Sequence, residues 1–232
     1  MGSLDDLRIR LDQTSERIVS RLKDRSRLPL NMPVYTPGTV FIRGRPGISL
    51  LQFAIEGMEA YHASLGRYEY KDQQPMFYET HLKSEVARMN TDTRLSGMRI
   101  RLVDDILTFY QRLLPELCSD GEDPSTYGET VYIDADLLEL IHERVNAMGR
   151  NIAQSKLESN PGIISSAKSA DASGLEALLR DPVREKDVIE KAKDVAERYG
   201  LDTKITADVF KWIMGKTLEV EVAYLQGVAR QT

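Results

Sequence analysis

The sequence has little of the chemistry on which many enzymes depend. Its 232 residues include one cysteine, Cys118, and three histidines, His62, His81 and His142. A single cysteine excludes a disulfide within the chain. Histidines scattered without ligand spacing argue against a zinc or di-iron site. The sequence shows no serine or cysteine nucleophile with a base and no glycine-rich phosphate loop. We therefore expect no metal, no cofactor and no covalent catalysis.

The sequence also lacks long apolar runs and basic clusters. No uncharged stretch approaches the length of a membrane span, and acidic Asp5 and Asp6 stand where a secretory signal would be basic and then apolar. The net charge is −5, which argues against nucleic acid or an anionic membrane as the main partner. We expect a cytoplasmic protein that binds neither.

What the sequence does contain is helical periodicity. The one candidate strand, residues 39–42, is short, and the proline- and glycine-rich stretch 29–47 leaves no room for a longer element. Apolar residues recur at helical spacing over about 3–28, 48–67, two segments within 79–118, 134–160, 163–169, 173–180, 182–200 and 206–226. We predict an all-α, single-domain multi-helix bundle that spans residues 1–232.

The helix predicted from residue 134 carries an arginine on its apolar face. At 100° per residue, Arg144 falls in the middle of a stripe formed by Leu137, Leu140, Ile141 and Met148. A buried arginine is costly unless an anion meets it. The anion could be a nearby carboxylate in a structural ion pair, or it could be a ligand.

Two later helices repeat this pattern. Thr217 and Glu221 lie one turn apart within the apolar stripe of the last helix, and burial should raise the pKa of Glu221 unless a cation is close. Glu185 lies on the apolar face of the helix that follows Asp181, which could simply be its N-cap. Thr217 could instead bond back to its own helix. Together with Arg144, these groups predict a pocket for a small polyanion that carries ether or hydroxyl groups.

The chain resembles the all-helical chorismate mutases of the larger fungal and plant type. The resemblance is carried by SLDDLRIRLDQTSERIVSRLKDR, LLQFAIEGMEAYHASLGRYEYKDQQPMF, LLPELCSDGEDPSTYGETVYIDADLLELIHERV, IAQSK and IMGKTLEVEVAYL, which are spread along the chain from residue 3 to residue 225. Residues 78–98 form a shorter stretch than in the family and match it poorly. The resemblance implies the concerted rearrangement of chorismate to prephenate, a step towards phenylalanine and tyrosine, by a homodimer.

The resemblance also implies roles for the residues around the reacting bonds. By position, Arg8 and Arg144 would hold the two carboxylates of chorismate. Lys156 would bridge a carboxylate and the ether oxygen. Glu221, in its protonated form, would donate a hydrogen bond to the same oxygen as negative charge grows on it.

The remaining implied contacts lie near the start of the helix after residue 181. Glu185 and the backbone at Asp181 would take the ring hydroxyl, and Thr217 would lie near a carboxylate. The local sequence DPVREKD matches the form of this motif found in bacterial members of the family. That form includes Arg184, which would add a further cation.

One spacing departs from the family pattern. The arginine and lysine of the central helix are eleven residues apart in the family, whereas Arg144 and Lys156 are twelve apart. Twelve residues place them about 120° apart on an ideal helix. We therefore predict a π-bulge between Val145 and Arg150, near Gly149, because single-residue insertions of this kind persist at functional sites. A regular helix would turn Lys156 away from the pocket.

Members of the family are often regulated by aromatic amino acids at a subunit interface. The positions that match this effector site are Arg67 and Gly128. Gly66 stands where a second arginine is expected, and Glu129 and Tyr132 replace small hydroxyl residues. An acidic residue beside the carboxylate of an amino acid is unfavourable, so we predict weak or absent feedback.

Two alternatives remain open from the sequence. The first is a related enzyme on the same scaffold, either an isochorismate pyruvate lyase or an aminodeoxychorismate mutase. The carboxylate of Glu185 suits a hydroxyl donor or an amine and does not decide between them. The second is a non-catalytic helical binding protein whose site has been broken by the inserted residue.

Overall fold

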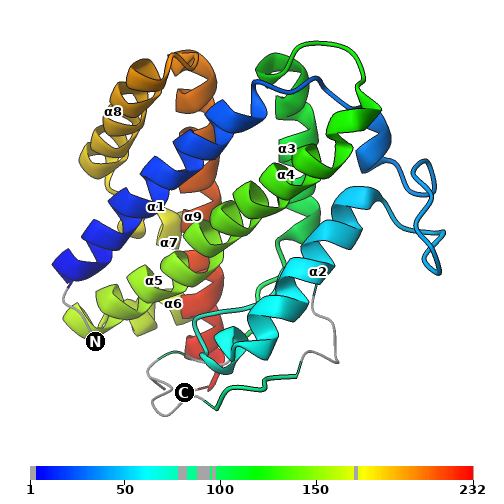
Figure 1. The fold of residues 1–232 in the computed structure, drawn as a ribbon. Coiled ribbons are helices and arrows are strands. Elements are labelled where there is room, and N and C mark those ends of the chain that lie inside the picture. Colours follow the sequence, from blue (N-terminus) through cyan, green and yellow to red (C-terminus); the bar gives the residue numbers. More distant parts are fainter. Residues whose placement is uncertain (1–3, 78–82, 88–94, 96–97, 170–171, 232) are drawn as a thin grey trace.

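The structure is a computed structural model that describes residues 4–77, 83–87, 95, 98–169 and 172–231 (Figure 1). These residues contain helices and no strand, so the all-α prediction is confirmed. The α-helices are α1 (Leu4–Arg25), α2 (Leu50–Ser64), α3 (Val103–Leu117), α4 (Tyr127–His142), α5 (Met148–Ser159), α6 (Ile163–Ser169), α7 (Ala172–Leu179), α8 (Pro182–Tyr199) and α9 (Thr203–Gln231). A π-helical turn, Glu143–Ala147, joins α4 to α5, and short 3-10 turns lie at Met32–Tyr35, Arg67–Glu69 and Pro124–Thr126.

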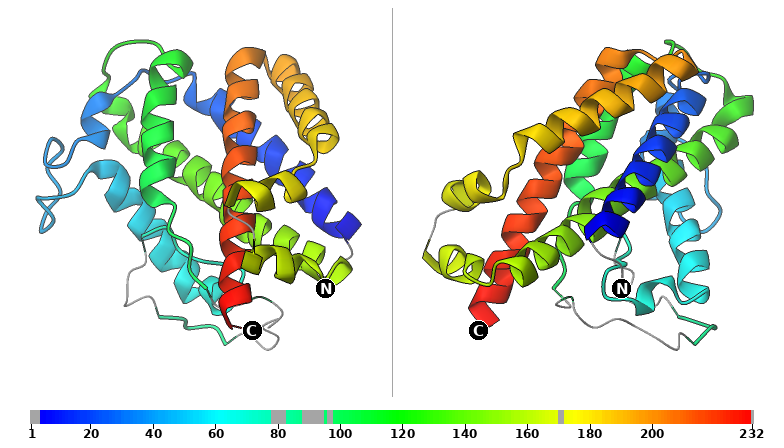
Figure 2. Two further views of the ribbon diagram at one scale, coloured as in Figure 1. Left: turned by 180° about the vertical axis from the view of Figure 1, so that it is seen from behind. Right: turned by 90° about the vertical axis from the view of Figure 1, so that its left-hand side faces the viewer.

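The helices pack around the central unit formed by α4, the π-helical turn and α5. Helix α1 lies alongside this unit on one side and α2 on the other (Figure 1). Helix α9 crosses behind it, and α8 packs against both α9 and α1 (Figure 2). None of the described helices is both long and apolar enough to cross a membrane. The start of α1, the second half of α5, the start of α8 and the middle of α9 are thereby brought to one region of the molecule.

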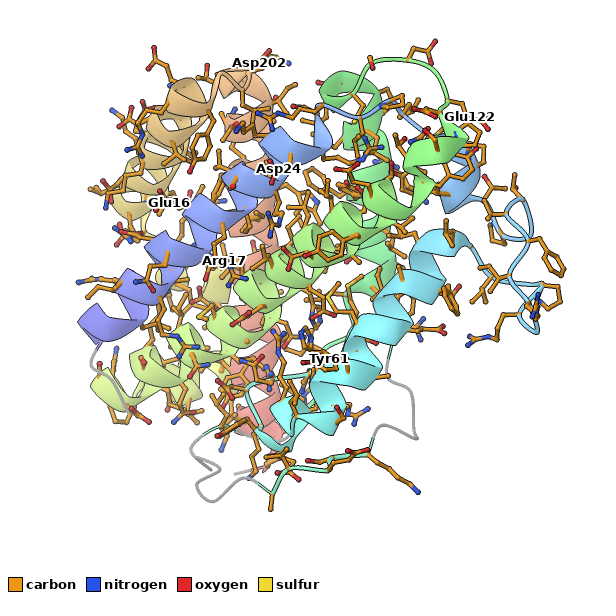
Figure 3. All side chains as sticks on the ribbon, viewed as in Figure 1. Glu16, Arg17, Asp24, Tyr61, Glu122 and Asp202 are labelled. Carbon is orange, nitrogen blue, oxygen red and sulfur yellow. The ribbon has the colours of Figure 1, made fainter. Side chains whose placement is uncertain are left out.

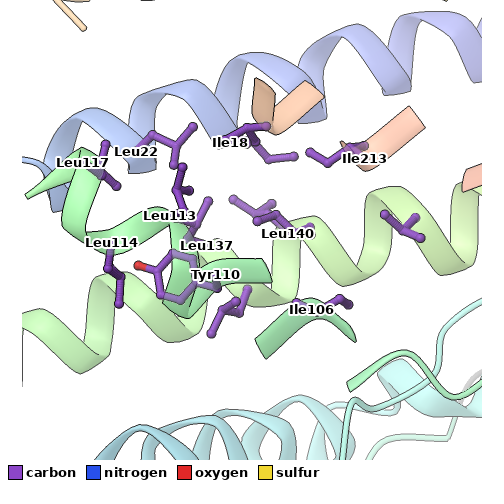
Figure 4. Packing of buried hydrophobic residues seen from close by; sticks show 14 of the residues in the cluster. Ile18, Leu22, Ile106, Tyr110, Leu113, Leu114, Leu117, Leu137, Leu140 and Ile213 are labelled. Atoms are coloured by element: carbon purple, nitrogen blue, oxygen red, sulfur yellow. The ribbon is translucent and has the colours of Figure 1, made fainter. Parts of the chain in front are cut away.

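The main core fills the space between α1, α3, α4 and α9. Ile18, Leu22, Tyr110, Leu137 and Ile213 are all essentially inaccessible to solvent, and their side chains point towards one another (Figure 4). Burying an aliphatic side chain of this size stabilises the folded state by about 1.5–3 kcal/mol. The core therefore gives the neighbouring pocket a rigid support.

A buried arginine within this core shows how the protein satisfies a structural guanidinium. Arg25 is completely buried, and its Nε lies 2.8 Å from Asp134 Oδ1. It also donates to the carbonyl oxygens of residues 28, 29 and 30 and to the Tyr35 hydroxyl. The hydroxyls of Tyr35 and Tyr110 donate to Asp134 in turn. The charge of Arg25 is thus paired with that of Asp134 within the chain.

Several predicted boundaries differ from the observed ones. The first helix ends at Arg25 rather than near residue 28, and the last helix starts at Thr203 rather than 206 or 208 and continues to residue 231 rather than 226. The earlier start has a local cause, because the side chain of Asp202 accepts a hydrogen bond of 2.7 Å from the Lys204 N–H. Residues 39–42 form turns and irregular backbone rather than a strand. The additional helix predicted before α3 falls largely outside the described residues.

The boundaries of α8 are as predicted. The Asp181 side chain accepts from the Arg184 N–H at 3.0 Å, and Pro182 occupies the first turn. Gly200 ends the helix with φ of +68°, a left-handed conformation that glycine adopts without steric cost.

Candidate active site

A cavity of about 180 Å³ lies where α1, α5, α7, α8 and α9 meet the π-helical turn. All the residues that the sequence singled out for the pocket line it: Arg8, Arg144, Lys156, Asp181, Arg184, Glu185, Thr217 and Glu221. The rest of the lining is mostly apolar: Leu7, Leu11, Ile152, Leu179, Val188, Met214 and Leu218. The cavity thus combines several charged groups with walls that exclude water.

Arg144 is the least satisfied charged group of the cavity. It is only 4% exposed, and its Nε has no hydrogen-bond partner among the described residues. Burial, reinforced by the nearby positive charge of Arg184, lowers the pKa of Arg144 to about 10, so it stays a cation at neutral pH. In contrast to Arg25, it has no described carboxylate within 4.0 Å. The structural ion pair considered from the sequence is therefore not found, and the guanidinium is available to an anionic ligand.

Lys156 and Glu221 form an ion pair inside the cavity. Lys156 Nζ lies 2.7 Å from Glu221 Oε2 and also donates to the carbonyl oxygen of Leu179 at 2.7 Å. Burial raises the pKa of Glu221, although Lys156 and Arg144 oppose this effect. A dianion bound next to Glu221 would raise its pKa further. This carboxyl group can therefore hold a proton and donate it in a hydrogen bond.

The predicted π-helical insertion is confirmed, but it lies slightly earlier than expected. The turn spans Glu143–Ala147 and includes Arg144 itself, whereas Gly149 lies in regular α-helix. One residue is absorbed, so the twelve-residue spacing from Arg144 to Lys156 behaves like eleven, or about 20° of rotation. Both side chains consequently reach the same cavity.

Two of the lining residues also have the local roles considered from the sequence. Asp181 caps α8, and the Thr217 hydroxyl donates to the Ile213 carbonyl oxygen at 2.8 Å. The single hydroxyl proton of Thr217 is therefore engaged, and its oxygen remains able to accept. Thr217 suits a hydroxyl donor on the ligand better than a carboxylate.

The charged groups at the start of α8 are paired with residues that the sequence reasoning missed. Glu185 lies 3.2 Å from Arg180 Nε, and Arg184 lies 2.9 Å from Asp12 of α1 and 2.6 Å from Asp187. Arg180 itself lines the cavity. Its position directly before the N-cap could have drawn attention to it. The Asp12 contact joins α1 to α8, so the periodicity of either helix alone could not predict it.

The positions matched to an effector site lie in two neighbouring cavities. Arg67 lines one of them, where its Nη2 lies 3.1 Å from Glu143 Oε2. Gly128 lines the other, next to Tyr132. His62 and Asp136 line both cavities. Arg67 therefore already has an acidic partner within the chain. In the part of the chain that the structure describes, no group of three or more histidine, cysteine or acidic side chains is arranged to hold a metal ion.

Comparisons with known proteins identify relatives of the chain. Residues 126–222 match the family model described as chorismate mutase type II. The chain is 25% identical to the Saccharomyces cerevisiae chorismate mutase over 247 residues, which cover 96% of this chain and 94% of that protein. It is also 25% identical to the chloroplastic chorismate mutase 1 of Petunia hybrida over 245 residues, covering 96% and 75% of the two chains.

Solved structures extend the similarity to the fold. The Candida albicans chorismate mutase in complex with L-tryptophan superimposes with a TM-score of 0.90 at 25% identity, covering 97% of this chain and 90% of that one. The chloroplast chorismate mutase of Zea mays gives a TM-score of 0.85 at 26% identity, covering 97% and 94%. The resemblance seen in the sequence is confirmed: the chain is a relative of the all-helical chorismate mutases of fungi and plants.

Proposed function

We propose that this chain, a relative of the all-helical chorismate mutases, binds chorismate in the cavity around Arg144 and rearranges it to prephenate. The observation that carries the proposal is the buried guanidinium of Arg144, whose Nε is unpartnered among the described residues and which shares its cavity with the Lys156–Glu221 pair. A small dianion with an ether oxygen complements this set of groups. The reaction is an isomerisation within one molecule and needs no cofactor.

Binding would begin with the two carboxylates of the substrate. The guanidinium of Arg144 presents a planar fork of N–H donors that matches a carboxylate. Arg8, at the start of α1, lines the same cavity and would hold the second carboxylate. Fixing both groups folds the two arms of chorismate together. The reacting carbons are thereby brought into the geometry that the concerted step requires.

The chemical step would be assisted at the ether oxygen. In the rearrangement the ether C–O bond breaks as a new C–C bond forms, and negative charge grows on the oxygen. Lys156 and the protonated Glu221 would each donate a hydrogen bond to that oxygen. Donors that act more strongly on the transition state than on the substrate contribute about 3–4 kcal/mol in comparable oxyanion sites. The apolar lining strengthens these bonds by excluding water.

The ring hydroxyl of chorismate would lie near the start of α8. Glu185 and the backbone at Asp181 would take it, and Arg184 would add positive charge on the same side. Glu185 is paired with Arg180 at 3.2 Å, and both residues line the cavity. A pyruvate lyase or an amino analogue mutase would use the same position. The non-catalytic alternative assumed that the inserted residue turns Lys156 away from the pocket. The π-helical turn accommodates this residue, so the assumption no longer supports that alternative.

We also propose a cytoplasmic homodimer. One relative of this chain is named a cytosolic chorismate mutase of Zea mays, at 26% identity. Tyr61 of α2, labelled in Figure 3, and Tyr132 of α4 are each 63% exposed. Both line the cavity that contains Gly128. Large exposed apolar groups of this kind suit burial against a second copy of the chain. Light scattering on the purified protein measures the assembly directly.

The first test is the loss of chorismate absorbance with purified protein, followed by acid conversion of prephenate to phenylpyruvate. Phenylpyruvate from the wild type, and none from Arg144→Met, is the expected result. Release of pyruvate instead would identify the lyase. If chorismate neither reacts nor raises the melting temperature, the proposed function is wrong, because binding to the folded state must stabilise it.

A further inference from the structure

Two buried polar side chains lie in and just after the π-helical turn that aligns Arg144 with Lys156. Asn146 lies within the turn and is 1% exposed, and Arg150 lies four residues later and is completely buried. Arg150 Nε donates to Asn146 Oδ1 at 2.8 Å, across the junction of the turn and α5. Neither residue is among those that line the active-site cavity. Their role must therefore be exerted through the helix.

Both side chains also bind backbone carbonyl groups outside the helix. Arg150 donates to the carbonyl oxygens of Lys71 and Asp72 at 2.7 and 2.9 Å. Asn146 Nδ2 donates to the carbonyl oxygen of Ile100 at 3.0 Å. A buried donor that loses such an acceptor is left unsatisfied, which destabilises the folded state. The central helix is thus anchored, at two points four residues apart, to the segments that follow α2 and precede α3.

The first residue of the turn has an anchor of its own. Glu143 Oε2 lies 3.1 Å from Arg67 Nη2, in the segment that follows α2. The last residue, Ala147, accepts a hydrogen bond of 2.8 Å from the side chain of Asn151. Isolated π-helical turns are rare and persist where their surroundings stabilise them. Here the surroundings supply side-chain bonds along the whole turn.

The consequence for the active site follows from helix geometry. If the turn relaxed to a regular α-helix, every residue after it would rotate by about 100° relative to those before it. Lys156 would then leave Glu221 Oε2, which is now 2.7 Å from its Nζ. Arg144 lies near the start of the turn and would be displaced less than Lys156.

We propose that Asn146 and Arg150 are positioning residues of the active site, which lock the π-helical turn to the carbonyl groups of residues 71, 72 and 100 and so keep Lys156 against Glu221. The kinetic part of the test rests on the proposed mutase activity. The structural part does not, because the exposure of Lys156 can be measured without any substrate.

The decisive comparison is between Asn146→Ala and deletion of Asn146. The alanine variant keeps the inserted residue but loses its anchor. The deletion returns the spacing of Arg144 and Lys156 to eleven, so both face the cavity without a π-helical turn. We expect the alanine variant to lose turnover by at least about a hundredfold, mainly in kcat, because a misplacement of only about 1 Å can already cost that much. The deletion variant should stay within about tenfold of the wild type.

The readout that is independent of activity is the rate at which an acylating reagent modifies Lys156. Peptide mass spectrometry measures this rate. The Lys156 side chain is 32% exposed and paired with Glu221, whereas that of Lys211 is 61% exposed and serves as the internal standard. Lys156 should become more reactive in Asn146→Ala and stay protected in the deletion variant. Gln154→Ala is the matched control, because it removes the α5 partner of the Tyr224 hydroxyl outside the turn. It should leave Lys156 protected.

The proposal is overturned if Asn146→Ala leaves the reactivity of Lys156 unchanged, or if the deletion exposes Lys156 as fully as alanine does. Should Asn146→Ala fail to fold, Arg150→Lys provides the same test, since lysine keeps the charge but cannot bind two carbonyl groups in the geometry of a guanidinium. A wild type without mutase activity would refute the proposed function alone, because the reactivity of Lys156 would still report the register of the helix.

Discussion

Gly149 of α5 packs directly against Val220 of α9. A β-carbon on Gly149 would lie 3.0 Å from Val220 Cγ1 and 3.3 Å from the carbonyl oxygen of Thr217. This approach holds the two helices close enough for Lys156 of α5 to reach Glu221 of α9 at 2.7 Å. The glycine is therefore part of what brings Lys156 and Glu221 together, although it lies outside the π-helical turn.

Gly149→Ala should accordingly weaken both folding and activity. The added methyl group must push α5 from α9, at a cost of about 1–3 kcal/mol in the free energy of unfolding. Turnover should fall because the Lys156–Glu221 contact lengthens. Gly215→Ala in α9 is the control, since a β-carbon there meets no atom within 4 Å. It should be neutral or stabilising by about 0.5–1 kcal/mol. Urea unfolding and chorismate kinetics measure both effects, and equal behaviour of the two variants would contradict this account.

Arg144→Met should separate stability from function. The wild-type guanidinium is buried without a described carboxylate partner, so replacing it with an apolar side chain should leave folding unchanged or stabilise it by about 1–4 kcal/mol. Turnover should be lost, because no cation then holds the substrate carboxylate. Arg25→Met is the matched comparison. It leaves Asp134 in the core without its cationic partner and should lower the free energy of unfolding by about 3–5 kcal/mol. Chemical denaturation distinguishes the two, and a strongly destabilised Arg144→Met would indicate a structural role.

The activity should depend on the protonation of Glu221. Burial raises the pKa of this carboxyl group, and the mechanism needs its protonated form. Activity is therefore expected to be full below the raised pKa and to decline as pH rises through it. Glu221→Gln keeps a donor that does not titrate, so its pH–rate profile should be flat over this range. Parallel profiles for the two proteins would exclude Glu221 as the proton donor.

A second buried carboxyl group should make the folded state sensitive to alkaline pH. Glu59 of α2 is completely buried, and burial together with Glu139 of α4 raises its pKa; burial also raises the pKa of Glu139. An acid whose pKa is higher in the folded than in the unfolded state stabilises the fold at low pH. That stability is lost as pH rises from the ordinary glutamate pKa through the raised one.

The melting temperature should therefore fall between mildly acidic and mildly alkaline pH. Glu139→Gln should flatten this decline, because the pair then contains one acid instead of two. Glu129→Gln, at an exposed position of α4, is the control and should follow the wild type. An unchanged slope in Glu139→Gln would show that the pair does not titrate in this range.

Feedback by aromatic amino acids should be weak or absent. One structural relative was solved in complex with L-tryptophan, and another carries phenylalanine in an allosteric site. In this chain Arg67 is already paired with Glu143, and Gly66 provides no second guanidinium for the carboxylate of an amino acid. Initial rates with and without tryptophan, tyrosine and phenylalanine test the prediction. A rate change of several-fold with any of them would refute it.

Local chemistry in the sequence was sufficient to predict most of the helices and their polar faces, although not all of their boundaries. The pair Asp181-Pro182 and Gly200 set the ends of α8, because capping and left-handed conformations depend on neighbouring residues alone. Arg144, Thr217 and Glu221 could be recognised because each interrupts an apolar stripe of its own helix. The π-helical insertion was predicted from the resemblance, because Arg144 and Lys156 are one residue further apart than the matching pair in the chorismate mutases.

Only the tertiary structure decided which groups meet. The 2.7 Å contact of Lys156 with Glu221 joins residues 65 positions apart, and the pairing of Arg184 with Asp12 joins positions 172 apart. The exact turn that absorbs the insertion is Glu143–Ala147, where Arg67 and Asn146 provide anchors, rather than the stretch near Gly149. Helical periodicity specifies the direction of a side chain within one helix. Its partner depends on how separate helices pack, and this is a property of the whole chain.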